Sequence, residues 1–151
     1  MGELIIREDA DIWENKSGML LIPVNCVGVM GCGLAKECRR RYPHVYRDYS
    51  KRCKEGSFNV NTLKLYLLSD DLGILLIPTK SDWRNPSEIG WVEDNLRKLG
   101  DCLIRTPLTT LHVPPIGCGA GGLQISAVRP LVEQYLCKPN VTVNFYQPYG
   151  N

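Results

Sequence analysis

The stretch Leu20–Leu34, with the sequence LLIPVNCVGVMGCGL, decides the fold of this chain. Its first five residues are apolar, as in a strand that is covered on both faces. Three glycines, Gly28, Gly31 and Gly33, then follow within six positions, where glycine lets backbone N–H groups approach an anion closely. A helix beginning near Leu34 would add its N-terminus, which favours negative charge. The pattern is typical of a phosphate- or sugar-binding loop, and a tight turn in an α/β domain would produce it as well.

Strands and helices alternate outward from this stretch. The periodicity predicts strands at 3–7, 20–24, 63–68, 74–77, 109–113 and 141–146, and helices at 34–41, 42–55, 85–103 and 126–137. The strands 63–68 and 74–77 flank a short turn and predict a hairpin. Pro43 should break the first helical stretch in two, and Pro130 leaves the start of the last helix open. The alternation predicts one α/β domain over residues 1–151, with three α/β/α layers.

The helix 85–103 has a recognisable start and a buried face. Asn85 can be the N-cap, Pro86 the first helical residue, and Glu88 the residue that reaches back as in a capping box. An apolar stripe at spacings of three and four follows: Ile89, Val92, Leu96, Leu99 and Leu103. This helix is therefore expected to pack on the sheet.

Composition excludes several classes of protein. With 44% hydrophobic and 23% charged residues, the 151-residue chain has the make-up of a globular domain. No apolar run approaches the roughly 20 residues that cross a bilayer, and the N-terminus lacks a signal-peptide pattern. We therefore expect no membrane association and a cytoplasmic location, which would be the host cytoplasm if a phage encodes the chain.

The cysteines do not follow a metal-binding pattern. There are seven, and no C-x-x-C occurs, so we expect no metal site and reduced thiols packed as small apolar groups. The histidines are His44 and His112. His112 lies in a strand pattern and is interpreted as structural, with a pair between Cys118 and His112 left open.

Positive charge is concentrated in one segment. Between Lys36 and Glu55 there are eight lysines and arginines against three acids, a local charge of +5 in a chain whose net charge is +2. Such a segment could meet a phosphate backbone, or it could be the solvated face of a helix.

Three loops, 25–34, 78–84 and 114–123, each follow an apolar strand. The carboxyl ends of strands line the ligand crevice in open α/β sheets, so the three loops are predicted to meet. Residues 117–122 formally contain G-x-G-x-x-G, but this motif stands near the C-terminus and no acid follows Glu133. A dinucleotide-binding unit needs the motif after its first strand and an acid about 20 residues later, so a dehydrogenase is set aside.

Together the three loops resemble the signature loops of macro domains. The matching stretches are PVNCVGVMGCGLA at 23–35, IPTKSDWRNPS at 77–87 and PPIGCGAGGL at 114–123. The likeness is strongest to the branch that holds the DarG-type DNA ADP-ribosyl glycohydrolase and the terminal ADP-ribose glycohydrolase. It spans nearly the whole chain, and it implies a three-layer α/β/α macro domain with a central mixed sheet.

The resemblance also implies an ADP-ribose pocket. In such a pocket Asp11 and Ile12 hold the adenine, Tyr146 stacks on it, the 117–123 backbone cradles the diphosphate, and Asn25 contacts the distal ribose under the 31–33 loop. The implied ADP-ribose-binding residues are Asp11, Ile12, Asn25, Gly31, Cys32, Gly33, Thr79, Ile116, Gly117, Cys118, Gly119, Ala120, Gly121, Gly122, Leu123 and Tyr146. From the residues alone, Asp11 could instead be a turn residue and Tyr146 a core residue.

Lys80 is the implied catalytic residue. In this branch the matching lysine attacks the anomeric carbon of the distal ribose and passes through an adduct that water releases. A lysine is a nucleophile only when neutral, which partial burial or a cationic neighbour such as Arg84 favours. The alternative is a surface pair between Lys80 and Asp82.

Two positions depart from the branch pattern. Gly121 stands where the terminal ADP-ribose glycohydrolase has an aspartate, which favours the DarG-type branch, and Cys32 stands where relatives often carry lysine. The implied function is an ADP-ribosyl hydrolase that acts on a modified macromolecule, with a nucleic-acid base favoured over an acidic protein side chain.

Trp83, Arg84 and the basic segment would contact DNA or RNA, no cofactor is needed, and a monomer is expected. The alternatives are an ADP-ribose-1″-phosphate phosphatase and a non-catalytic ADP-ribose-binding module.

Overall fold

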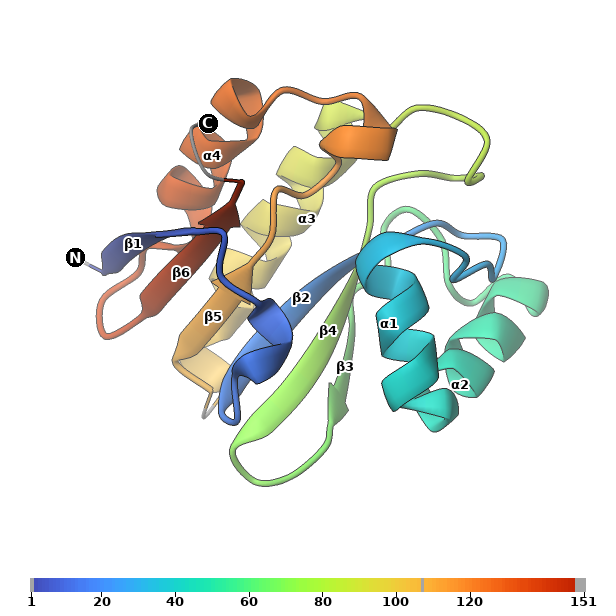
Figure 1. Cartoon of the computed structure of the whole chain (residues 1–151), viewed down its shortest axis with the longest axis horizontal. Coiled ribbons are helices and arrows are strands. Elements are labelled where there is room, and N and C mark those ends of the chain that lie inside the picture. Colours follow the sequence, from blue (N-terminus) through green and yellow to red (C-terminus); the bar gives the residue numbers. More distant parts are fainter. Residues whose placement is uncertain (1, 107, 149–151) are drawn as a thin grey trace.

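The computed structural model describes residues 2–106 and 108–148. Its six strands form a single sheet in the order β1-β6-β5-β2-β4-β3 (Figure 1). All neighbouring strands are parallel except β3 and β4, which pair antiparallel as the predicted hairpin, so the sheet is mixed. The strands are β1 Glu3–Glu8, β2 Gly18–Val24, β3 Lys64–Leu67, β4 Leu72–Pro78, β5 Thr110–Val113 and β6 Thr142–Gln147.

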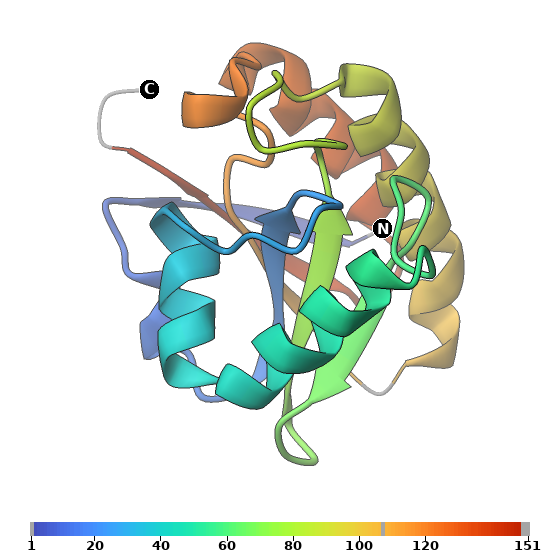
Figure 2. The same cartoon turned by 90° about the vertical axis from the view of Figure 1, so that its right-hand side faces the viewer.

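Four α-helices cover the two faces of the sheet. They are α1 Gly33–Arg41, α2 Pro43–Lys54, α3 Ile89–Cys102 and α4 Ile125–Leu136, and the short 3₁₀ turns are η1 Ile12–Glu14, η2 Leu103–Arg105 and η3 Gly119–Gly121. Figures 1 and 2 show α1 and α2 on one side of the sheet and α3 and α4 on the other. The predicted three-layer α/β/α arrangement is confirmed.

The alternation of side chains along β2 divides the core between the two faces. Met19 and Leu21 join the cluster under α3 and α4, which includes Val92, Leu96 and Val132. Leu20, Ile22 and Val24 join the cluster under α1 and α2. Successive residues of a strand point to opposite faces, so a continuous apolar run is what a strand between two helical layers requires.

Most boundaries lie within two residues of the predicted ones. Pro43 separates α1 from α2 and stands at the first position of α2, where its missing N–H costs nothing. Pro130 lies inside α4, so the helix begins before it, at Ile125. The helices in the described part of the chain are all too short or too polar to cross a bilayer.

The predicted start of the third helix is wrong. α3 begins at Ile89 rather than after Asn85, and its N-cap, Glu88, makes no side-chain capping bond. The backbone of the preceding residues is used elsewhere: the Ser87 amide donates to the Gly121 carbonyl (2.9 Å) and the Glu88 amide donates to the Thr79 carbonyl (3.1 Å). These contacts with distant loops hold residues 87 and 88 outside the helix, although the sequence supplies a good capping box.

We expect Leu96→Ala to lower the free energy of unfolding by about 2–5 kcal/mol, the usual cost of a buried leucine truncation. Leu96 is fully buried between α3 and the sheet. Urea denaturation checks the loss. Ile104→Ala is the matched control, because Ile104 is 90% exposed and its truncation should change stability by under about 0.5 kcal/mol.

Candidate functional site

The three predicted loops meet at the carboxyl ends of β2, β4 and β5 and enclose a cavity of about 780 Å³. This volume is in the usual range for small-molecule and cofactor sites. Ten of the predicted ADP-ribose or catalytic residues line the cavity, together with Trp83: Asn25, Gly31, Cys32, Gly33, Thr79, Lys80, Gly117, Cys118, Gly119 and Gly121. Residues 107 and 149–151 lie outside the described part of the chain.

Asn25 organises the first loop. Its side-chain oxygen accepts hydrogen bonds from the amides of Val27 (3.1 Å) and Val29 (3.3 Å), and its Nδ2 donates to the Val29 carbonyl (2.7 Å). The Tyr49 hydroxyl, on α2, donates to the carbonyl and side-chain oxygens of Asn25, both at 2.9 Å. Most of the hydrogen-bonding capacity of this amide is therefore used to shape the loop, and these contacts leave only the second Nδ2 hydrogen unused.

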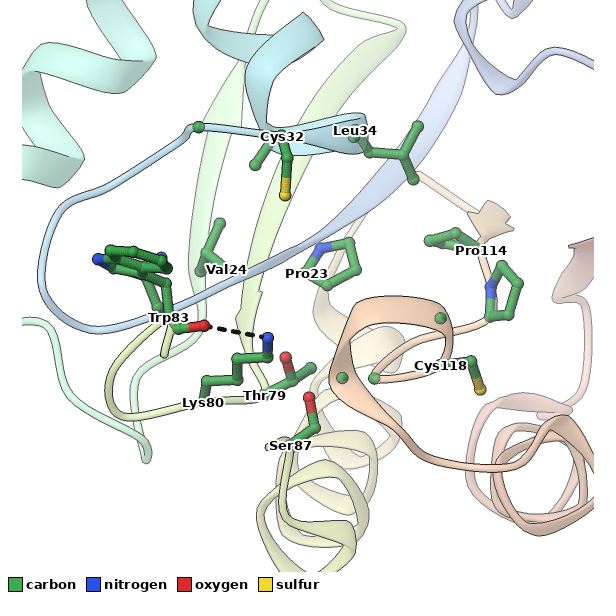
Figure 3. Close-up of a pocket in the computed structure, with 18 of the residues that line it drawn as sticks. Pro23, Val24, Cys32, Leu34, Thr79, Lys80, Trp83, Ser87, Pro114 and Cys118 are labelled. Atoms are coloured by element: carbon green, nitrogen blue, oxygen red, sulfur yellow. Dashed lines mark hydrogen bonds between the residues drawn. The ribbon is translucent and has the colours of Figure 1, made fainter. Parts of the chain in front are cut away.

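Lys80 lies on the second loop, directly after β4. Its Nζ donates to the backbone carbonyl of Trp83 at 3.4 Å, and Figure 3 shows the amine inside the cavity beside Thr79 and facing the glycine loop. Asp82 accepts two hydrogen bonds from the Arg84 side chain, and this pairing lowers the pKa of Asp82 to about 2. The charge of Arg84 is thus paired with Asp82.

Trp83 forms the exposed rim of the cavity. The indole is 52% exposed, and the Arg84 guanidinium lies 5.7 Å from its ring centre. Arg84 itself does not line the cavity.

The third loop is shaped by its own backbone. The amides of Cys118 and Leu123 donate to the carbonyls of Pro115 and Gly117, both at 3.0 Å, which closes the loop around η3. Gly117 has a φ of 74°, and a Cβ there would lie 2.6 Å from Leu123 Cδ1, so glycine is required at this position. A preformed, glycine-rich backbone is suited to an anionic ligand.

Ser87 is a cavity residue that the sequence analysis did not identify. Its amide donates to the Gly121 carbonyl, so the second and third loops touch through Ser87. A Cβ at Gly121 would lie 2.3 Å from Ser87 Oγ and 3.9 Å from Lys80 Cε. This contact joins residues that are 34 positions apart, and no local sequence pattern predicts it.

The predicted adenine-end residues lie together but outside the cavity lining. The Asn15 side chain donates to the Ile12 carbonyl and to the Tyr146 hydroxyl, both at 2.8 Å, and so ties the two segments. Asp11 caps η1 by accepting from the Trp13 amide, while Ile12 and Tyr146 belong to the core under α1 and α2.

The remaining predicted residues of the third loop differ in their placement. Ile116 is fully buried in the core, Leu123 packs on that core, and Gly122 is exposed outside the cavity lining. The side chain of Ala120 is not among those that the structure describes.

The pair between Cys118 and His112 that the sequence left open is not formed. The ring nitrogens of His112 face the Ser17 carbonyl (2.9 Å), the Tyr146 hydroxyl (3.3 Å) and Asn144 Nδ2 (3.4 Å). Cys118 Sγ lies 3.7 Å from the Ile116 carbonyl instead, and burial raises the pKa of its thiol. Cys118 is therefore a protonated thiol with no base to activate it.

The expectation of reduced thiols packed as small apolar groups is met for some of the other cysteines. All seven cysteines are free, and Cys38 is packed in the core, but Cys32 and Cys102 are exposed rather than buried. No group of three or more histidine, cysteine or acidic side chains that could hold a metal occurs among residues 2–106 and 108–148.

The basic segment forms the surface of α1 and α2. Several of its charges are paired within the helices: Glu37 with Arg40 and Arg41, and Asp48 with Arg52. The residues of α1 that line the cavity, Gly33, Leu34 and Ala35, are uncharged, and the arginines of α1 stand in its last turn.

Comparison with known proteins identifies the family. Residues 22–132 match the family model of the Macro domain, and the chain belongs to the macro domain family.

Among curated relatives, the chain is 34% identical, over 93% of its length, to a DNA ADP-ribosyl transferase-DNA ADP-ribosyl glycohydrolase fusion protein of Thermosipho africanus, of which the match covers 41%. The chain spans about two-fifths of the length of the curated relatives it matches.

Two solved structures are also similar. The macrodomain of Mycobacterium tuberculosis DarG superposes with a TM-score of 0.87 at 31% identity, covering 98% of this chain and 99% of that one. The Thermosipho africanus DarTG in complex with ADP-ribose superposes with a TM-score of 0.88 at 33% identity, covering 100% of this chain and 43% of that one.

We expect Tyr49→Phe to lower the free energy of unfolding by about 1–3 kcal/mol, because it leaves two buried oxygens of Asn25 without this donor. Burial raises the pKa of Tyr49 above its ordinary value, so its hydroxyl is a donor at neutral pH. Urea denaturation measures the loss. Tyr46→Phe is the control, because the Tyr46 ring contacts Arg39 and its hydroxyl has no hydrogen bond with the described residues. Equal losses in both variants would contradict the role of Tyr49.

The burial of His112 predicts that the stability of the fold depends on pH. Burial lowers the pKa of His112 in the folded state below its ordinary value near 6.5, so the unfolded chain takes up a proton first as the pH falls. The stabilising contribution is complete above that value and is lost as the pH falls below it. Urea denaturation at pH 7 and pH 5 should show a smaller pH effect for His112→Gln than for the wild type. His44→Gln, at an exposed position, should keep the wild-type effect.

Proposed function

We propose that this macro domain is an ADP-ribosyl hydrolase that removes ADP-ribose from a modified nucleic-acid base, with Lys80 as the nucleophile. The observation that carries the proposal is the position of the Lys80 amine inside the cavity that the three loops form. Relatives that are about one-third identical are named DNA ADP-ribosyl glycohydrolases, and one of them has been solved with ADP-ribose.

The loops offer groups that suit each part of ADP-ribose. The glycine-rich backbone of residues 117–122 suits the diphosphate, since amide groups can approach phosphate oxygens there. The 31–33 loop and Asn25 lie on the opposite wall, where the distal ribose would lie next to Lys80. The Asp11, Ile12 and Tyr146 cluster lies beyond the cavity and would receive the adenine.

The proposed reaction uses the lysine amine as the nucleophile and water to release the product. The neutral amine of Lys80 attacks the anomeric carbon and the bond from that carbon to the base breaks. The proton that the newly alkylated amine loses passes to the leaving base. Water then hydrolyses the lysine adduct, which releases ADP-ribose and restores the amine.

A nucleic-acid substrate is favoured by the surface beside the cavity. Trp83 at the rim can stack on a base, and arginine beside it adds a cation–π contribution. The basic residues of α1 and α2 suit a phosphate backbone.

Lys80→Ala tests the proposal. We expect the variant to lose at least 100-fold in release of ADP-ribose from ADP-ribosylated thymidine DNA, while its affinity for free ADP-ribose changes by less than about three-fold. Release is measured by chromatography of the nucleotide, and affinity by calorimetry. Lys98→Ala is the matched control, because Lys98 also donates to a backbone carbonyl, that of Asn61, but lies on α3 away from the cavity.

A panel of substrates separates the alternatives. Wild-type turnover of ADP-ribosylated DNA, but not of glutamate-linked ADP-ribosyl protein or ADP-ribose-1″-phosphate, is the expected result. Cleavage of the phosphate ester by Lys80→Ala as well as by the wild type would indicate a phosphatase. Tight ADP-ribose binding with no turnover in the panel would indicate a binding module, and the hydrolase proposal would be wrong.

A further inference from the structure

Ser87 lines the cavity and carries a buried hydroxyl whose hydrogen-bonding capacity is unused. The residue is 7% exposed and lines the cavity, and its Oγ has no hydrogen-bond partner among the described residues. Figure 3 shows the hydroxyl beside Thr79 and Lys80, directed toward the glycine loop. A buried hydroxyl without a partner costs free energy, and a ligand in the cavity that this residue lines can supply that partner.

The surrounding backbone fixes the position of this hydroxyl. The Ser87 amide donates to the Gly121 carbonyl at 2.9 Å, and the next amide, that of Glu88, donates to the Thr79 carbonyl at 3.1 Å. Both bonds involve main-chain atoms, so they hold the residue in place whatever its side chain. The hydroxyl is therefore attached to a rigid part of the site.

Gly121 lies directly against the Ser87 hydroxyl. A Cβ at this position would lie 2.3 Å from Ser87 Oγ and 3.1 Å from Ser87 Cβ, and the side chain of Lys80 would be 3.9 Å away at its Cε. Ser87 Oγ and the side chain of Lys80 thus both lie beside Gly121. The serine hydroxyl and the lysine side chain therefore belong to the same part of the cavity wall.

We propose that Ser87 is a ligand-contacting residue whose hydroxyl hydrogen-bonds a hydroxyl of the sugar that lies against Lys80. This assignment rests on the proposed function, because it takes the sugar next to Lys80 to be the distal ribose of ADP-ribose. Serine can donate and accept at once, as can a sugar hydroxyl, so the pair satisfies both groups. The contact would hold the anomeric carbon at a set position relative to the lysine amine.

Calorimetry of Ser87→Ala with two nucleotides tests the assignment. ADP-ribose carries the distal ribose and ADP lacks it, so the variant should bind ADP-ribose about five-fold more weakly or worse and bind ADP as the wild type does. The substitution keeps the backbone bonds of residue 87, and an unchanged thermal midpoint confirms the fold. Ser81→Ala is the matched control, because Ser81 lies exposed on the same loop and outside the cavity lining.

Gly121→Ala supplies an independent variant. Its new methyl group displaces Ser87 Oγ, so this variant should also bind ADP-ribose more weakly. In the double variant with Ser87→Ala, the loss of binding free energy should be smaller than the sum of the losses in the two single variants. Additive losses would contradict the assignment.

The outcomes separate the two proposals. Unchanged ADP-ribose affinity in Ser87→Ala, or equal losses for ADP-ribose and ADP, would overturn the role of Ser87 and leave the hydrolase proposal standing. A selective loss for ADP-ribose in a chain that shows no turnover would support the Ser87 contact and contradict the hydrolase. A wild-type chain that binds neither nucleotide would overturn both.

Discussion

The parallel pairing of β2 with β4 is the constraint on which the site depends. The pairing runs from Gly18 and Leu72 to Val24 and Pro78, so the two strands end side by side. It continues past their ends, because the Thr79 amide donates to the Val24 carbonyl and the Cys26 amide donates to the Ser81 carbonyl, each at 3.0 Å. The loops that carry Asn25 and Lys80 therefore leave the sheet already joined by backbone hydrogen bonds, and their relative position does not depend on a ligand.

The third loop is attached to this pair by a different kind of contact. Ser87 bonds to Gly121 through the backbone, and the absence of a side chain at Gly121 allows the two loops to approach this closely. Gly121 is thus a packing requirement of the contact between the two loops. An aspartate here would require Ser87 to move, so residues 87 and 121 constrain each other physically.

The local sequence pattern was sufficient to predict an element of the fold where a single local preference dominates. The apolar run of β2, the hairpin of β3 and β4 and the break at Pro43 each follow from a residue's own conformational preference or burial. The local pattern gave a wrong helix start at Asn85. Residues 87 and 88 instead form backbone hydrogen bonds with Gly121 and Thr79, and α3 begins at Ile89. The local pattern also left open a Cys118–His112 pair, which the contacts of His112 with Ser17, Asn144 and Tyr146 exclude.

The sequence by itself determined the α/β/α layering, the three loops and the family, because strand and helix periodicity and the loop motifs are properties of contiguous residues. The tertiary structure decided which of those residues share a cavity. Lys80, Asn25 and the glycine loop meet there, and the Asp11 and Tyr146 cluster lies outside its lining. Ser87 ends the second matching stretch, but only the tertiary structure places it in the cavity wall. The physical reason is that these relations are set by strand order and by contacts across tens of residues, and no local propensity encodes them.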